Sequence, residues 1–154
     1  MYDLIKGNLT RQFKGLELLS SLLEEEFQLL FHRDTDAVTA LEFSIHELLR
    51  QIAVERMDLK STMQGTKLLE YATLLPEEDG EEVRRLYYLI DSLEQRCSKQ
   101  ATHNTQLSLA LLDQSQDLLV FLHNQIQPKQ TQCYGARGKL RENRPQAAIF
   151  TGRF

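Results

Sequence analysis

Apolar residues recur every three or four positions over most of the chain, which is the period of an amphipathic helix. In the first segment, residues 2–31, they are Ile5, Leu9, Phe13, Leu16, Leu19, Leu23, Phe27 and Leu30. In the second segment, residues 35–60, they are Val38, Leu41, Ile45, Leu48, Ile52 and Leu59. Between the two segments, Asp34 or Thr35 can accept a hydrogen bond from a free backbone N–H and so begin the second helix. The pattern predicts two long helices joined by a short turn.

A third and longer helix is predicted over residues 80–127, after a short helical segment at 67–75. Acidic residues follow Pro76 directly, and there they stabilise the positive end of a helix dipole. Neither Pro nor Gly occurs between Glu81 and Gln127, and Pro128 then ends the helix. No internal repeat and no long heptad pattern is evident. We therefore predict an all-α, antiparallel three-helix bundle with one very long C-terminal helix.

The two halves of this long helix differ in how far their apolar residues spread around it. In the first half, Val83, Leu86, Ile90, Leu93 and Cys97 fall within about 80°, which one neighbouring helix can cover. In the second half the spread is about 200°, which one neighbour cannot cover. The members of this wide arc are Leu107, Ala110, Leu111, Leu112, Leu118, Leu119, Phe121, Leu122 and Ile126. Either the first two helices bury the whole arc as core, or part of it stays open for an amphipathic partner helix.

Charge is divided unevenly along the 154 residues. Residues 1–127 hold 12 basic and 21 acidic side chains, whereas residues 128–154 hold 6 and 1. The acidic part argues against a nucleic-acid surface, because phosphate binding needs clustered Lys and Arg. The C-terminal part contains two of the 3 Pro and three of the 7 Gly. We predict a helical domain at 1–127 and a flexible basic tail at 128–154.

Side-chain patterns typical of enzymes are missing from the sequence. It has no glycine-rich phosphate loop, no G-x-S-x-G and no H-E-x-x-H motif. Glu42 and His46 could form half of a metal site, although an exposed helix pair is the simpler interpretation. We predict a non-enzymatic protein with no cofactor and no metal. Without a signal segment or an apolar stretch of about 18 residues, we expect a cytoplasmic protein that does not insert into membranes.

Several features occur together in the sequence. The first helix is rich in leucine, the second ends in ELLRQIAVER, and the third carries Asn104-Thr105-Gln106-Leu107 before LALL. The tail contains CYGARGK, in which Tyr134, Gly135 and Gly138 form a Tyr-Gly-x-x-Gly step. This combination resembles the FlgN family of flagellar type III export chaperones. The likeness covers nearly the whole chain as a pattern of helices, and its specific part is Arg56, Asn104 with the leucines after it, and the Tyr-Gly step.

The resemblance implies a chaperone that binds the C-terminal segments of hook-associated proteins, the proteins of the hook–filament junction. It would prevent their premature assembly and deliver them to the cytoplasmic domain of the flagellar export gate. The client-binding residues that it implies are Asn104, Leu107, Leu111, Leu112, Leu118, Leu119, Leu122 and Ile126. For docking at the gate it implies Tyr134, with Gly135 and Gly138. The alternative is a helical scaffold or adaptor that self-associates through the same apolar stripe and has no secreted client.

Overall fold

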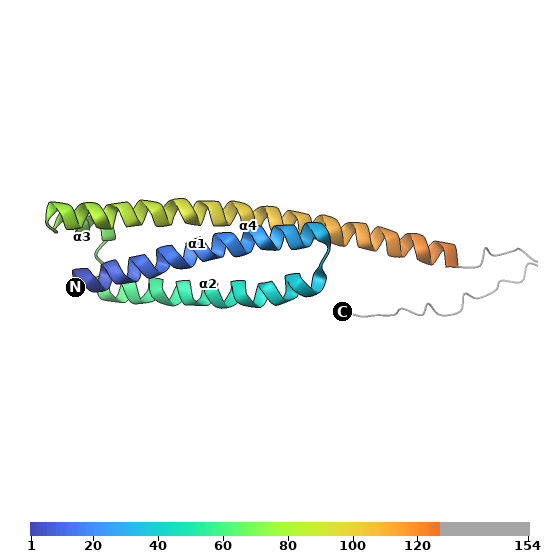
Figure 1. Cartoon of the computed structure of the whole chain (residues 1–154), viewed down its shortest axis with the longest axis horizontal. Helices are drawn as coiled ribbons and strands as arrows, with labels where there is room; N and C mark the ends of the chain where they lie inside the picture. The colour runs from blue at the N-terminus through green and yellow to red at the C-terminus, as the bar shows by residue number, and fades with distance from the viewer. Residues whose placement is uncertain (127–154) are drawn as a thin grey trace, which may run out of the picture. The chain divides into compact units, whose positions relative to one another are not determined.

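The computed structural model describes residues 1–126, and all regular structure in this range is helical (Figure 1). The helices are α1 (Tyr2–His32), α2 (Thr35–Met63), α3 (Leu68–Thr73) and α4 (Glu77–Ile126). The predicted all-α fold with a long C-terminal helix is confirmed. The chain divides into two compact units, Met1–Leu112 and Asp113–Phe154. Each unit is described by itself below.

The turn between α1 and α2 is built from two local features. Arg33 adopts a left-handed conformation with φ 59°, which ends α1 while its N–H donates to the carbonyl of Leu30. Asp34 then begins α2, because its carboxylate accepts a hydrogen bond of 3.1 Å from the N–H of Ala37. Of the two predicted caps, Asp34 is therefore the one used.

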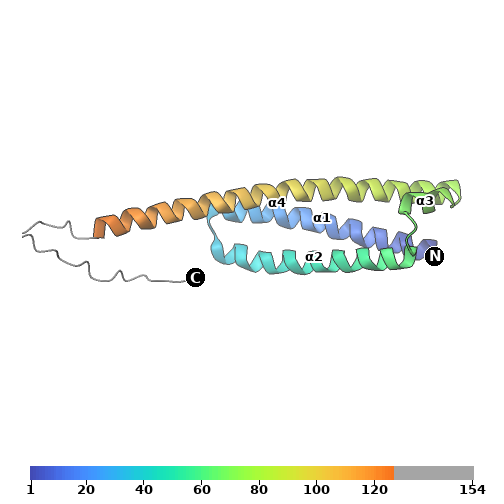
Figure 2. The same ribbon diagram turned by 180° about the vertical axis from the view of Figure 1, so that it is seen from behind.

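α1 and α2 pack side by side in opposite directions (Figures 1 and 2). Asn8, near the start of α1, donates a hydrogen bond of 2.8 Å to the carbonyl of Glu55, near the end of α2. Arg11 pairs with the same Glu55 at 2.6 Å, and this hydrogen bond lowers the pKa of the Glu55 carboxyl. These contacts fix the relative register of the two helices.

α4 runs parallel to α1 within the Met1–Leu112 unit. Tyr2 donates to Glu82 at the beginning of both helices, and Asn104 donates to the carbonyl of Leu23 further along both. α4 also contacts α2, through an ion pair between Arg56 and Glu94. The unit is thus an up-down-up arrangement of three long helices.

The buried positions of this bundle repeat every seven residues. In α4 they include Val83, Ile90, Cys97 and Asn104. The same spacing relates Leu9, Leu16 and Leu23 in α1, and Ile45 and Ile52 in α2. A seven-residue period is the signature of helices that wind around each other in a left-handed supercoil. The heptad pattern was not evident from the apolar residues, because polar residues such as Gln12 and Asn104 occupy some of its core positions.

Candidate functional site

A continuous run of exposed apolar side chains lies near the end of α4. Leu118, Leu119, Val120, Phe121 and Leu122 follow one another directly, and their exposed fractions lie between 45% and 65%. Ile126 is 79% exposed, and every residue from Asp113 to Ile126 belongs to the exposed class. This stretch of helix therefore presents its apolar side chains to solvent.

Such exposure is unusual for this sequence pattern. Five consecutive helical residues point in all directions around the axis, and a helix that is apolar all round is normally buried. Between residues 108 and 126 the only Asp, Glu, Lys or Arg residues are Asp113 and Asp117. Exposed apolar patches on soluble proteins mark binding surfaces or association sites. The C-terminal part of α4 is therefore the strongest candidate for a binding surface among the described residues.

Asn104, for which the family resemblance implies client binding, is buried. Only 3% of it is exposed. Its Nδ2 donates to the Leu23 carbonyl at 2.8 Å and to the Glu26 carboxylate at 2.5 Å, and its Oδ1 accepts from Gln100 at 3.0 Å. In this structure the Asn104 side chain holds α4 to α1, and we do not include it in the proposed client surface.

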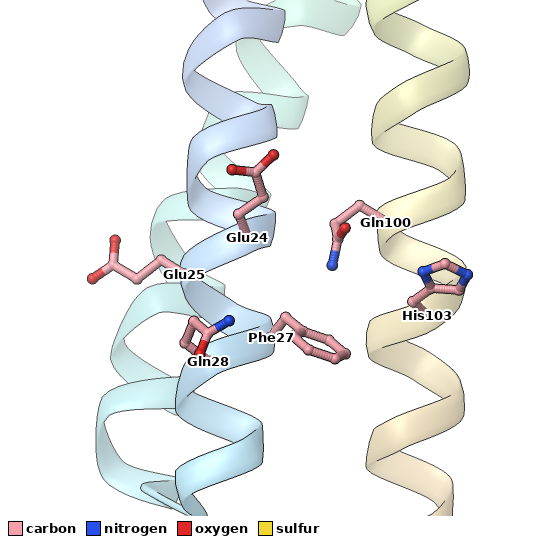
Figure 3. Close-up of a pocket in the computed structure, with 6 residues that line it drawn as sticks. All are labelled: Glu24, Glu25, Phe27, Gln28, Gln100 and His103. Carbon is pink, nitrogen blue, oxygen red and sulfur yellow. The ribbon is translucent and has the colours of Figure 1, made fainter.

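A depression lies between α1 and α4 within the first unit (Figure 3). It is lined by Glu24, Glu25, Phe27 and Gln28 of α1 and by Gln100 and His103 of α4. Glu24 is paired with Arg96 at 2.5 Å. This depression was not predicted from the sequence, because its polar residues are spaced like any exposed helix face.

Among residues 1–126, no cluster of three His, Cys, Asp or Glu side chains is placed to hold a metal ion. None of the helices described combines the length and hydropathy needed to cross a membrane.

Residues 1–142 of the chain match the model of the FlgN protein family. The chain belongs to the FlgN family. FlgN proteins are cytoplasmic, non-enzymatic chaperones that serve hook-associated proteins in flagellar export. No curated protein and no solved structure matches the chain.

The predicted client-binding residues of this FlgN protein differ in exposure. Leu107 and Leu111 are half-buried, whereas the five predicted client-binding residues that follow them in the sequence are at least 45% exposed. These exposed residues are Leu112, Leu118, Leu119, Leu122 and Ile126. That they contact the client stays a prediction.

Two exposed apolar residues of this FlgN chain were not predicted to bind the client, and three predicted gate-docking residues lie outside the described residues. Val120 and Phe121 are 60% and 57% exposed but were not among the client-binding residues that the resemblance implies, although Phe121 belongs to the wide apolar arc described from the sequence. The uninterrupted apolar run at 118–122 was the signal that could have identified both. The predicted gate-docking residues Tyr134, Gly135 and Gly138, like the predicted tail at 128–154, lie outside the described residues.

Proposed function

We propose that this FlgN chaperone binds its hook-associated client through Leu118, Leu119, Phe121, Leu122 and Ile126, which together we call the α4 surface. The observation that carries the proposal is their exposure, which lies between 45% and 79%. Apolar residues on one helix suit an amphipathic helix of the client, because each partner removes the apolar face of the other from water. Covering the client's own assembly face in this way prevents its premature assembly.

The α4 surface is tested by replacing single exposed leucines. Leu118→Ala and Leu122→Ala should each weaken client binding about tenfold or more, because burying a leucine contributes roughly 1.5 to 3 kcal/mol. Helicity should be unchanged, since both side chains are exposed in the free chain. Titration calorimetry with a purified hook-associated protein measures the affinity.

The matched control is Leu4→Ala, which removes a leucine of α1 that is 70% exposed. It should leave the affinity within twofold of the original chain. If Leu118→Ala and Leu122→Ala bind the client as tightly as this control, the α4 surface is not the client site.

We further propose that Tyr134 in the tail docks the chaperone at the cytoplasmic domain of the export gate. A tyrosine offers a large, rigid apolar area with a hydrogen-bonding tip, which is why it is enriched at binding hot spots. Gly135 and Gly138 allow sharp backbone turns that present the ring. Pro128 separates this segment from the client-binding helix, so we expect the two contacts to be energetically independent.

Because we expect client binding and gate binding to be independent, the role of Tyr134 can be tested separately from the α4 surface. Tyr134→Ala should weaken gate binding and slow secretion of hook-associated proteins while client affinity and helicity stay unchanged. Phe150→Ala serves as the control, because it removes another aromatic ring of the same tail. Unchanged gate affinity in Tyr134→Ala, or loss of gate and client binding together, would contradict the docking role.

A further inference from the structure

The outer face of α2 carries a second set of exposed side chains, separate from the α4 surface. Its members alternate at spacings of three and four residues, which is the spacing of a coiled-coil seam. We call this set the α2 seam, and its members are Ala40, Phe43, Glu47, Arg50, Val54 and Met57. They fall within about 100° of one another on the helix, roughly opposite the buried Ile45 and Ile52. The large apolar members, Phe43, Val54 and Met57, are between 46% and 73% exposed.

The two charged residues in the middle of the α2 seam pair with each other within the helix. Arg50 donates to the Glu47 carboxylate through Nε at 2.9 Å and through Nη2 at 2.7 Å. Hydrogen bonds from Arg50 and Gln51 lower the pKa of the Glu47 carboxyl to about 2, so this group stays ionised. A purely apolar partner helix would place both charges against hydrocarbon, which is unfavourable. A partner suited to the seam therefore carries a guanidinium and a carboxylate of its own.

The α2 seam has this composition when it is read in the opposite direction. Around a two-fold axis halfway between Glu47 and Arg50, Glu47 of one copy faces Arg50 of the other. The other facing pairs are Phe43 with Val54 and Met57 with Ala40, so that each larger side chain meets a smaller one. In a parallel pair of helices, Glu47 would face Glu47 and Arg50 would face Arg50. The charges thus favour a second copy in the antiparallel direction.

We propose that two copies of this chain form a dimer by packing their α2 seams against each other, antiparallel and around a two-fold axis. The interface is then isologous, because the same residues serve both copies. The inference does not rest on the proposed function, since no residue of the α4 surface belongs to the α2 seam. Each dimer carries two α4 surfaces.

Reversal of charge in the α2 seam tests the dimer by sedimentation equilibrium of the full-length chain. Glu47→Arg and Arg50→Glu, each alone, should weaken dimerisation about tenfold or more, because like charges then face each other. An equimolar mixture of these two variants should associate as tightly as the original chain, since the charges of one complement those of the other. Glu81→Arg and Arg84→Glu are the matched controls, because they change an exposed ion pair of the same spacing in α4. They should leave dimerisation unchanged.

The direction of the two α2 helices is measured by disulfide crosslinking in full-length chains that carry Cys133→Ser. Phe43→Cys and Val54→Cys should crosslink when the two variants are mixed, and neither should crosslink to itself. Self-crosslinking of each variant without crosslinking in the mixture would overturn the antiparallel arrangement.

Two results of sedimentation would overturn the dimer itself. The first is an original chain that stays monomeric up to about 100 μM, where a complex with a micromolar dissociation constant is largely formed. The second is a dimer whose affinity neither Glu47→Arg nor Arg50→Glu changes, because its interface then lies elsewhere. A monomeric chain in which these two variants weaken client binding would also overturn the inference, and would assign the α2 seam to the client.

Discussion

Polar side chains occupy core positions of the helical bundle, and their hydrogen bonds explain why they are tolerated. Asn104 satisfies its amide with the Leu23 carbonyl, the Glu26 carboxylate and the Gln100 amide. Gln12 is 3% exposed and donates to Asn8 at 2.6 Å. Among residues 1–126, no buried side-chain nitrogen or oxygen is left without a partner. Such satisfied polar positions fix the register of a bundle more than they add to its stability.

At the scale of single residues, the structural role of Asn104 gives a testable prediction. Asn104→Ala should lower the free energy of unfolding by about 1 to 3 kcal/mol, because the carbonyl of the buried Leu23 and the half-buried Glu26 and Gln100 side chains lose their hydrogen bonds. Client affinity, measured under conditions where the variant is folded, should stay the same. Gln106→Ala, at an exposed position two residues on, is the control and should change neither quantity. Weakened client binding with unchanged stability would instead support the client contact that the sequence implied for Asn104.

At the scale of whole helices, the close packing of α3 against the first turn of α4 depends on a glycine. Gly80 is buried in the first turn of α4, and a Cβ atom at this position would overlap the carbonyl oxygen of Ala72 in α3. Gly7 of α1 has more space, since the nearest atom to an added Cβ is the flexible Arg11 guanidinium at 3.5 Å. The two glycines therefore differ in what a methyl group would meet.

This difference predicts opposite effects of the same substitution. Gly80→Ala should lower stability by about 1 to 3 kcal/mol, because the helices must move apart. Gly7→Ala should raise stability by about 0.5 to 1 kcal/mol, since Ala is the better helix former. Urea denaturation of the two variants measures both effects. Equal gains in stability would show that α3 does not pack closely on α4.

Local signals define where α2 and α4 begin, although α4 begins at Glu77 and not at the predicted residue 80, and α2 ends at Met63 and not at residue 60. Asp34 caps α2, and Pro76 precedes the first residue of α4. The heptad pattern was missed because an apolar spacing cannot identify polar core residues. Phe13, which belongs to the predicted stripe, is half-buried, whereas the neighbouring Gln12 is buried. Which of the two faces the core depends on the packing of α1 against its neighbours, and the sequence of α1 alone does not contain this.

At the scale of the whole molecule, the sequence located the surplus apolar surface but not its exposed part. Helical spacing alone shows that the arc after Leu107 is too wide for one neighbour. Where the covered part ends is a property of the fold: Leu107 and Leu111 are half-buried, whereas Leu118 is 57% exposed. Membership of the FlgN family adds the kind of client, and the exposed residues add the proposed place of contact.

Hydrogen–deuterium exchange of the free chaperone and of its complex with a hook-associated protein tests the central claim most directly. In the free chain, backbone amides of residues 113–126 should exchange faster than those of residues 83–104, because their side chains are exposed. On client binding, residues 113–126 should become protected, with little change at 83–104. A stable complex in which residues 113–126 exchange as fast as in the free chain would contradict the proposed client site.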